Sequence, residues 1–391
     1  MSLKILHIPD TCTGCGACVS SCPKHALSLV YDADGFYAPK LNEGLCMDCK
    51  ACEKVCHVLN NHQPSQPSRN YKAFMVKSHD LDLVKNYASS GGAFTLMAQK
   101  ILKRSGVVYG ARYNFEKERL EHASTDNVSL QELQKSKYIE SFMGNTFTDV
   151  RKQLISGRKV MFVGTPCQVE GLHTFLVQRK TDMQNLLLVR FVCHGVPANK
   201  FFTEYKHYEE SKFGSEMTFF DFRPKSSGWR SSDWLMRFKN GREEKGPYYY
   251  YYYYYYFQLC TLLRSSCYSC KRVMHEIADV TIADFWGIHM YRPENKDQDG
   301  ISLVIVHSEV GGRILEAIKP YCDCEELPAS AIEYIYREAN DRKDYLNKSK
   351  SNKAKVREIG YMPFVIKTLR GSMMVMKLKY KLRKILLWIR K

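Results

Sequence analysis

The feature that most limits how this chain can fold is a repeated cysteine spacing within its first sixty residues. Two segments read C-x2-C-x2-C-x3-C, with cysteines at positions 12, 15, 18 and 22 and again at 46, 49, 52 and 56. Three thiolates on one tight loop can bind three corners of an iron–sulfur cubane, while the fourth points away and binds another cubane. We therefore expect a small head built around two [4Fe-4S] clusters.

This spacing is that of bacterial two-cluster ferredoxins, in which the fourth cysteine of each motif serves the other cluster. The predicted ligand sets are Cys12, Cys15, Cys18 and Cys56 for one cluster, and Cys46, Cys49, Cys52 and Cys22 for the other. Pro23 follows the first motif as the pattern expects, whereas His57 takes that place in the second. Zinc sites also use C-x2-C pairs but seldom carry this double register. Residues 27–41, with Asp-Ala-Asp-Gly at the centre, predict a hairpin between the motifs.

Length and cysteine use narrow the class of protein. The chain has 391 residues and 15 cysteines, and no secretory leader follows Met1. Many cysteines in such a chain indicate metal or redox use rather than disulfides, so we expect a cytoplasmic protein. No run of about 18 apolar residues occurs, which argues against a spanning helix.

The positive charge is concentrated at the end of the chain. Of a formal net charge of +17, residues 342–391 contribute +14, from 16 basic and 2 acidic residues, which leaves +3 for the rest. A nearly neutral body gives no support for binding nucleic acid, and we expect no such partner.

Beyond the head, the sequence predicts a linker, a large domain and a tail. The polar, proline-containing residues 61–70 separate the head, 1–60, from a large domain, 71–340, and residues 341–391 form the tail. Buried strands are expected at 71–76, 107–111, 159–163, 186–192, 280–283 and 303–306, and helices at 93–102, 170–178, 200–212 and 312–319. The fold class is therefore α+β or mixed α/β, with a ferredoxin-like head.

Two helix starts in the large domain carry candidate ligands. The helix 93–102 is preceded by Ser89, Ser90, Gly91 and Gly92. Backbone N–H groups exposed there would suit a phosphate or pyrophosphate, although an ordinary serine N-cap is an alternative. Thr165 and Pro166 suit the start of a second helix, where Cys167 would meet N–H groups that favour a thiolate.

A second set of cysteines lies in the large domain. Its members follow expected strands or form a C-x2-C hook: Cys167, Cys193, Cys267 and Cys270. Four cysteines are the right number for a third cluster or a zinc ion, and buried structural cysteines are the alternative. Cys260, Cys322 and Cys324 are expected to be buried bystanders.

Seven motifs of the large domain resemble the family of coenzyme F-420 hydrogenase and dehydrogenase β-subunits. They are SSGGAFTLMAQKIL (89–102), KSKYIESFMGN (135–145), KVMFVGTPCQVEGL (159–172), VCHGVP (192–197), FRPKSSGW (222–229), CYSCK (267–271) and DVTIADFWGI (279–288). The resemblance covers about 70–340, and a ferredoxin-like head is a common fusion in that family. Family members are flavoproteins that hold FAD beside a [4Fe-4S] cluster and exchange electrons with an organic acceptor.

The resemblance implies roles for particular residues. It implies that Cys167, Cys193, Cys267 and Cys270 hold a flavin-proximal [4Fe-4S] cluster. It also suggests that Ser89, Ser90, Gly91, Gly92 and Lys137 lie on the flavin side, with Asp284 close to the site. A ferredoxin or another redox protein would then supply electrons. The acceptor is not implied, because relatives reduce different substrates.

Nine consecutive tyrosines, 248–256, depart from the family pattern. Both faces of a strand would be tyrosine, so we expect a drifted low-complexity repeat that favours aggregation if exposed. Stacking on a planar substrate is the alternative.

The tail is expected to have two parts. Residues 342–358 are polar and basic, which indicates a solvated linker or frayed helix. In 371–391 an apolar stripe recurs at helical spacing, formed by Leu378, Leu382, Ile385, Leu386 and Ile389, with basic residues on the other arc. Such a basic amphipathic helix could lie on an anionic membrane surface, or pack on its own domain or a partner.

Three functions fit these features. The first is a flavin- and iron–sulfur-dependent oxidoreductase that passes electrons from a low-potential donor to FAD and an organic acceptor. The second is an electron-transfer subunit that relays to a partner enzyme. The third is a metal-stabilised binding module held at a membrane surface by its tail.

Overall fold

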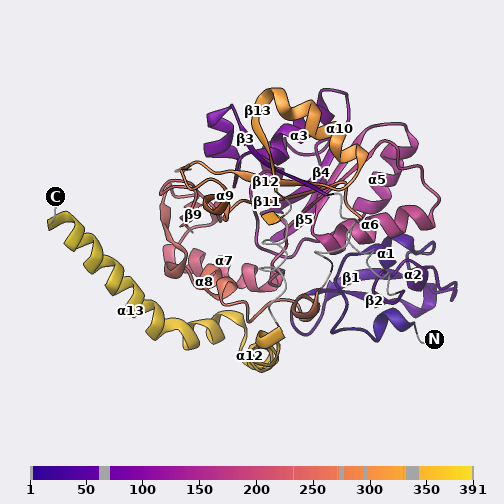
Figure 1. The fold of residues 1–391 in the computed structure, drawn as a ribbon. Coiled ribbons are helices and arrows are strands. Elements are labelled where there is room, and N and C mark those ends of the chain that lie inside the picture. Colours follow the sequence, from indigo (N-terminus) through magenta and orange to yellow (C-terminus); the bar gives the residue numbers. More distant parts are fainter. Residues whose placement is uncertain are drawn as a thin grey trace.

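The computed structural model describes residues 3–60, 71–231, 233–270, 272, 277–294, 297–328, 330–331 and 343–389, with side chains of the last helix described through 376 and at 378. The expected linker 61–70 lies outside these residues, and the domain limits at 60, 70 and 340 stay predictions. Figure 1 shows the N-terminal head beside a body built on a large sheet, with the last helix extending away from the body.

The head forms around the two cysteine segments. It contains η1 (Lys4–Leu6), α1 (Ala17–Ser21), β1 (Leu27–Tyr31), β2 (Tyr37–Leu41), η2 (Glu43–Leu45) and α2 (Ala51–Lys54). The predicted hairpin is confirmed, because β1 and β2 pair antiparallel with Leu27 opposite Leu41. Asp32 closes the turn by accepting hydrogen bonds from the amides of Asp34 and Phe36 at 2.9 Å, as an Asx turn does.

The body is built on an eight-stranded mixed sheet, so the predicted fold class is confirmed. The strand order is β13-β3-β12-β11-β7-β6-β4-β5. The bounds are β3 (Lys72–Ser78), β4 (Val107–Asn114), β5 (Arg119–Ser124), β6 (Val160–Gly164), β7 (Leu186–Phe191), β11 (Val280–Asp284), β12 (Ser302–Val306) and β13 (Cys322–Leu327). All six predicted strands are present; β5 and β13, which end the sheet antiparallel to their neighbours, were not predicted.

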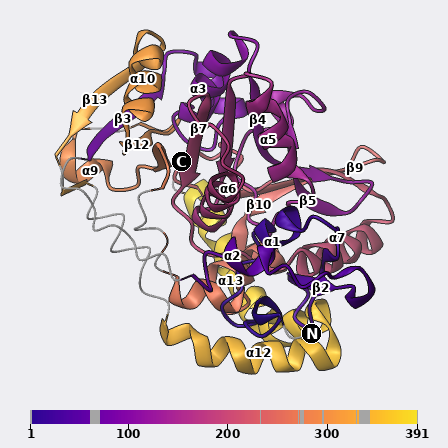
Figure 2. The same ribbon diagram turned by 90° about the vertical axis from the view of Figure 1, so that its right-hand side faces the viewer.

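Helices cover both faces of the sheet because its strands alternate apolar residues between two cores. Val108 and Met161 face α3 (Ala93–Leu102) and α10 (Glu309–Ile318). Val107 and Phe162 face α5 (Thr146–Ile155) and α6 (Pro166–Gln178). Ala17 and Val55 of the head belong to this second core, and Figure 2 shows α1 and α2 beside α6. The head therefore packs on the α6 side of the body.

A second, smaller sheet and its helices form an aromatic core beside the main sheet. The elements are α7 (Asn199–Phe213), β8 (Met217–Asp221), β9 (Asp233–Phe238), β10 (Glu243–Pro247), η4 (Tyr248–Tyr250) and α8 (Tyr252–Gln258). Short elements elsewhere are η3 (Leu83–Tyr87), α4 (Leu130–Leu133), η5 (Ser265–Ser269), α9 (Ile288–Tyr291), η7 (Lys319–Tyr321) and η8 (Lys343–Tyr345).

The tyrosine run lies in η4 and α8 rather than in a strand, with four of its nine side chains buried and the other five half-buried. Tyr253 and Tyr254 are 0 % and 1 % exposed in α8. The Tyr253 ring lies 4.6 Å from that of Phe201, and its hydroxyl donates to the Tyr138 carbonyl at 2.7 Å. The expectation considered a strand, in which tyrosines would cover both faces. In a helix they cover all sides, and the surrounding aromatic core accepts them.

The first part of the tail was expected to be a solvated linker or a frayed helix. It forms a helix, α12 (Leu346–Ile359), which is packed rather than solvated: Lys353 is 3 % exposed, and Arg357 Nε donates to Asp34 Oδ1 of the head hairpin at 2.7 Å. The next helix, α13 (Tyr361–Ile389), begins buried and then extends outward (Figure 1). Of the predicted apolar stripe, only Leu378 has a described side chain, and it is 59 % exposed. Along the described residues, no helix combines the length and apolar character needed to cross a bilayer.

Candidate functional site

The eight head cysteines lie in two groups of four. The first group, which we call the inner group, lines one small pocket and contains Cys12, Cys15, Cys18 and Cys56. The second, the outer group, lines another pocket and contains Cys22, Cys46, Cys49 and Cys52. Within each motif the fourth cysteine has crossed to the other group, which is the arrangement that the two-cluster spacing requires. Ligation of iron by these groups remains a prediction.

Backbone N–H groups point at cysteine sulfurs in the head and in the body. The Ala26 amide donates to Cys22 Sγ at 3.2 Å, and the Gly195 amide donates to Cys193 Sγ at 3.4 Å. Such N–H···S bonds stabilise thiolate sulfur and tune the potential of a bound cluster. The donor sets therefore fit iron–sulfur clusters.

The four body cysteines predicted to be ligands come from three separate segments and line one cavity of about 600 Å³. Cys167 is the second residue of α6, Cys193 follows β7, and Cys267 and Cys270 lie in and directly after η5. We call them the Cys167 group. Burial, and then the charges of Cys267 and Cys167, raise the pKa of Cys193.

The start of α6 forms as the sequence predicted. Thr165 and Gln168 make a capping box in which Gln168 Oε1 accepts from the Thr165 amide at 2.9 Å, and Pro166 is the first helical residue. The expected thiolate at Cys167 does not follow from the protein alone, because burial raises the pKa of that thiol despite a hydrogen bond with Thr165 Oγ1. A cationic metal centre would supply the charge that lowers it.

Most residues predicted on the flavin side line the same cavity. Those that do are Ser89, Ser90, Gly92, Lys137 and Asp284. Gly91 is not among the lining residues; a Cβ there would lie 2.1 Å from the Val76 carbonyl oxygen, so its role is close packing against β3. The N-cap of α3 is Gly92 at φ +92°, not a serine. Ser89 Oγ instead accepts from the Ser136 amide at 2.8 Å, and Ser90 Oγ donates to the Ile301 carbonyl at 2.6 Å.

Lys137 and Asp284 differ in how they are held. Lys137 Nζ donates to the Gln134 carbonyl at 2.6 Å, and burial lowers the pKa of this amine to about 7. Asp284 accepts from Arg223 Nη1 at 3.1 Å and from Trp229 Nε1 at 3.2 Å. Asp284 is therefore positioned by two donors, while Lys137 brings to the cavity an amine whose pKa lies near neutral pH.

The cavity also contains residues that the sequence analysis did not assign. They share aromatic or basic character: Phe94, Lys135, Tyr138, Arg223, Tyr254, Phe257 and Trp286. Tyr138 stacks on Phe257 with ring centroids 4.8 Å apart, and the Arg223 guanidinium lies 4.7 Å from the Trp286 ring centroid. Aromatic walls and cationic groups fit a planar, anionic cofactor such as FAD. Several belong to the quoted motifs, but only the fold shows that they face one space.

The inner group and the Cys167 group meet at α6. A Cβ at Gly171 would lie 2.9 Å from Cys15 Sγ, and Gly171 is four residues, or one helical turn, beyond Cys167. Burial, together with Cys56 and Cys167, raises the pKa of Cys15 to about 12. At the other end of the head, Cys49 is exposed. The cysteine groups thus lead from solvent through the head to the cavity.

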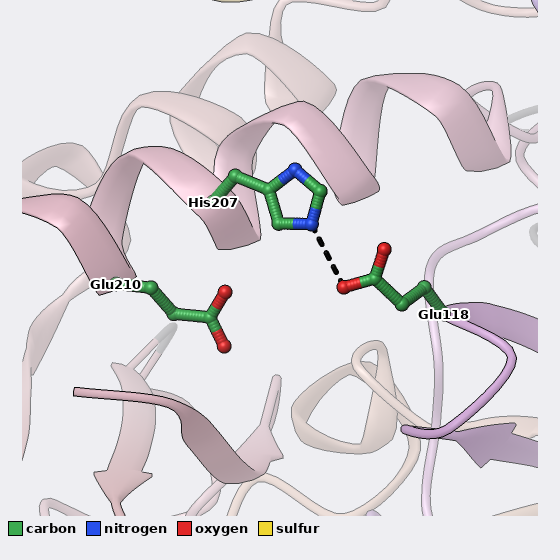
Figure 3. A group of neighbouring side chains, drawn as sticks. All are labelled: Glu118, His207 and Glu210. Atoms are coloured by element: carbon green, nitrogen blue, oxygen red, sulfur yellow. Dashed lines mark hydrogen bonds and ion pairs between the residues drawn. The ribbon is translucent and has the colours of Figure 1, made fainter.

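One trio outside the cavity resembles a metal site but is satisfied by a lysine. Glu118, His207 and Glu210 place ligand atoms within 4.8 Å of one another, and Figure 3 shows His207 directed at Glu118. Lys206 Nζ, however, lies 2.7 Å from Glu118 Oε1 and 2.8 Å from Glu210 Oε1. The ammonium group bridges the two carboxylates and occupies the place that a metal ion would take, so this trio is part of an ion-pair network.

Comparison with known proteins gives two matching family descriptions. Residues 11–60 match the 4Fe-4S dicluster domain. Residues 157–329 match the C-terminal part of the beta subunit in the coenzyme F420 hydrogenase/dehydrogenase family. The two matches cover the head and the part of the body that contains the whole Cys167 group.

Two similar proteins come from Methanosarcina species. A subunit of the F(420)H(2) dehydrogenase of Methanosarcina mazei is 19 % identical over 338 residues, 83 % of this chain and 87 % of that protein. A chain of the F420-reducing [NiFe] hydrogenase complex of Methanosarcina barkeri is 15 % identical with a TM-score of 0.46, covering 72 % of this chain and 91 % of that one. The dicluster head, the match of residues 157–329 and the dehydrogenase relative support the coenzyme F420 hydrogenase/dehydrogenase β-subunit family for this chain, and with it an iron–sulfur electron-transfer role in the oxidoreductase class.

Proposed function

We propose that the protein is an iron–sulfur flavoprotein oxidoreductase that passes electrons from a low-potential donor through three [4Fe-4S] clusters to FAD and an organic acceptor. The observation that carries this proposal is the series of cysteine groups that runs from exposed Cys49 to the cavity. The inner group lies between them, with Cys15 Sγ against Gly171 of α6. Low-potential thiolate-ligated clusters suit the reductive direction.

The chain's own cysteines would hold the clusters. The outer group, the inner group and the Cys167 group would each ligate one, and such clusters carry single electrons when bound. The outer group faces solvent through Cys49, where a ferredoxin-like donor can approach. Cys167 and Gly171, against which Cys15 Sγ packs, lie one turn apart on the same face of α6. The order of the three groups in space gives electrons one continuous direction.

The cavity residues would hold FAD, which exchanges single electrons for a hydride when bound. Lys135, Lys137 and Arg223 bring cationic groups to its wall, and the backbone at the α3 start lines it through Gly92. Burial lowers the pKa of Lys137 to about 7, so this amine can hold or release a proton near neutral pH. Asp284 keeps its orientation through Arg223 and Trp229. The aromatic side chains keep water from the ring system.

A second candidate function is an electron-transfer subunit without substrate chemistry of its own. The relative from Methanosarcina mazei is named as a subunit of a dehydrogenase, which favours a partner protein here. The discriminating measurement is whether the isolated chain reduces any small acceptor when a low-potential donor is supplied. Reduction supports the oxidoreductase, and its absence over a broad acceptor screen supports the relay.

We also propose that α13 attaches the protein to an anionic membrane surface. Residues 377–391 carry seven basic and no acidic side chains, and the helix projects from the body (Figure 1). Met374 and Leu378 are 72 % and 59 % exposed, as an interfacial helix requires. Deletion of 371–391 should abolish sedimentation with vesicles that contain anionic lipid. If the truncated chain sediments equally well, the attachment is wrong, and so is a membrane-bound binding module.

The test of the main proposal is the iron, acid-labile sulfide and flavin content of anaerobically purified protein. Three [4Fe-4S] clusters beside one flavin predict about twelve iron atoms and one FAD per chain. About eight iron atoms without flavin would leave only the head loaded and would contradict the proposal.

A further inference from the structure

Three charged or polar side chains meet in the interior between the head and α6. They are His57 from the head, Glu170 from α6 and Arg272 from the segment after the C-x2-C hook. His57 and Glu170 are each 2 % exposed. A histidine at position 57 departs from the two-cluster spacing, which has Pro23 at the matching place. The departure therefore coincides with a contact that an isolated ferredoxin would not make.

The distances describe one connected network. Arg272 Nε lies 2.8 Å from Glu170 Oε2 and 3.0 Å from His57 Nδ1. His57 Nδ1 lies 3.4 Å from Glu170 Oε2, and Thr13 Oγ1 of the inner loop lies 3.3 Å from His57 Nε2. Two segments of the head and two of the body thus converge on one buried ion pair.

Each member of this network is attached next to a cysteine of the inner group or the Cys167 group. His57 follows Cys56, Arg272 is two residues after Cys270, and Glu170 is three residues after Cys167 on the same helix. Glu170 also precedes Gly171, the residue against which Cys15 Sγ packs. A displacement of any of the three side chains would therefore move a cysteine of one group relative to the other.

We infer that His57, Glu170 and Arg272 are positioning residues that hold the inner group and the Cys167 group at the separation needed for electron transfer between them. The inference deepens the proposed function and rests on it. In the step concerned, one electron would pass from a cluster held by the inner group to a cluster held by the Cys167 group. No covalent bond forms or breaks, and the three side chains contribute geometry and a fixed ion pair.

A second buried ion pair also joins the head to the body, but at a different place. Arg264 pairs with Glu140, and its Nη1 and Nη2 donate to the carbonyls of Cys12 at 3.2 Å and Tyr37 at 2.8 Å. Arg264 thus bonds to main-chain carbonyls at the start of the inner loop and on the hairpin, not to a side chain beside α6. The His57 network, by contrast, spans the face where Cys15 meets α6.

The test uses two variants and one matched control in the full-length, cluster-loaded protein. His57→Pro restores the residue that follows the first cysteine motif, so the inner cluster should still assemble. Glu170→Gln keeps the side-chain shape and removes its charge. The control is Gln178→Ala, which deletes another contact between the head and α6, the 2.9 Å bond from Gln178 Nε2 to the Ala51 carbonyl. Gln178 lies about two turns beyond Glu170 on α6 and is therefore further from Cys167.

Two readouts are needed besides turnover. The first is the spin–spin coupling between the inner and Cys167 clusters in electron paramagnetic resonance spectra of the reduced protein. The second is the rate of head-to-body transfer after rapid mixing with dithionite. We expect both variants to keep wild-type iron content, lose coupling and slow transfer about tenfold or more, because transfer depends steeply on relative placement, while Gln178→Ala matches the wild type.

The possible outcomes separate this inference from the proposed function. Wild-type coupling and transfer in both variants would overturn the inference alone. Loss of the third cluster's iron in Glu170→Gln, with His57→Pro unchanged in every readout, would also overturn it, because the residue would then hold a cluster rather than set a separation. Eight iron atoms in the wild-type protein would instead overturn the proposed function.

Discussion

The two cysteine loops of the head share one backbone conformation but meet different surroundings. In the inner loop, Gly14 and Gly16 have φ of 66° and 76°. At the matching places of the outer loop, Asp48 and Lys50 have φ of 52° and 59°. Both loops therefore wrap their cysteines with two left-handed residues, although only one loop uses glycine.

The difference comes from what lies against each loop. A Cβ at Gly14 would approach Arg264 Nη2 to 2.6 Å and the Tyr37 carbonyl oxygen to 2.9 Å. The outer loop faces solvent, and Met47 is 58 % exposed. Glycine is thus required by the close approach of Arg264 from the body and of the head's own hairpin at Tyr37, rather than by the cysteine loop itself. Under the proposed function, the inner loop would pass electrons into the body and the outer loop would meet the donor.

The largest expected effect comes from interrupting the proposed electron path where it would enter the body, just beyond the inner loop. Cys167→Ala removes a predicted ligand of the body cluster, so turnover should fall to background while both head clusters remain. Turnover is measured with a small acceptor, and iron content should fall from about twelve to about eight per chain. The control is Cys260→Ala, since Cys260 lines the same cavity without an assigned role. Unchanged activity in Cys167→Ala would remove the third cluster from the proposal.

A stability comparison tests why the loops differ in sequence. Gly14→Ala should destabilise the head–body unit by about 2–4 kcal/mol, combining left-handed strain with overpacking against Arg264. Lys50→Gly should change stability by less than about 1 kcal/mol, towards stabilisation, because relief of strain is opposed by glycine's entropy. Chemical unfolding under anaerobic conditions measures both. Equal losses in the two variants would show that the loop, not its neighbour, requires glycine.

The buried part of the molecule should also make its stability depend on pH, through His122 at the cavity wall. Burial lowers the pKa of His122 from 6.5 to about 4, and its ring nitrogens bond Ser141 Oγ at 2.8 Å and the Val163 carbonyl at 3.0 Å. Between these pH values the unfolded chain binds the proton more readily, so stability is full above about pH 6.5 and declines towards pH 4, by at most about 3 kcal/mol.

His122→Gln should flatten this decline between pH 6.5 and 4. Urea unfolding at several pH values gives the slope, and His289→Gln, at an exposed position, is the control that should keep it. The same slope in His122→Gln as in the wild type would assign the acid sensitivity to other groups.

The head was largely predictable from sequence because its chemistry is local. The cysteine spacing predicts which four cysteines group together, and the hairpin turn follows from Asp32 and Gly35. The interface was not predictable in the same way. Nothing in the sequence indicates that His57 meets Glu170 or that Cys15 meets Gly171, since these contacts depend on how α6 lies against the head.

The body was predictable in its elements but only partly in its site. Buried apolar runs gave six strands of the sheet, whereas polar edge strands such as β5 carry a weaker pattern. The tyrosine run was considered as a strand although it forms η4 and α8, because nine identical residues show no periodicity that could distinguish a strand from a helix. The cavity's cationic wall of Lys135, Lys137 and Arg223 comes from distant segments, and their convergence is a property of the fold.

The smallest expected effect concerns the outer loop as the surface that meets the donor. Leu45 and Met47 are 52 % and 58 % exposed beside exposed Cys49. Met47→Lys should raise the KM for a small iron–sulfur donor protein about fivefold, near 1 kcal/mol, because an apolar contact is replaced by a solvated charge. Reduction by dithionite should not change, since that reagent needs no docked protein. Ile155→Lys, equally exposed on α5, is the control. A KM that stays constant in Met47→Lys would show that the donor binds another face of the head, and it would not bear on the proposed role of the inner loop.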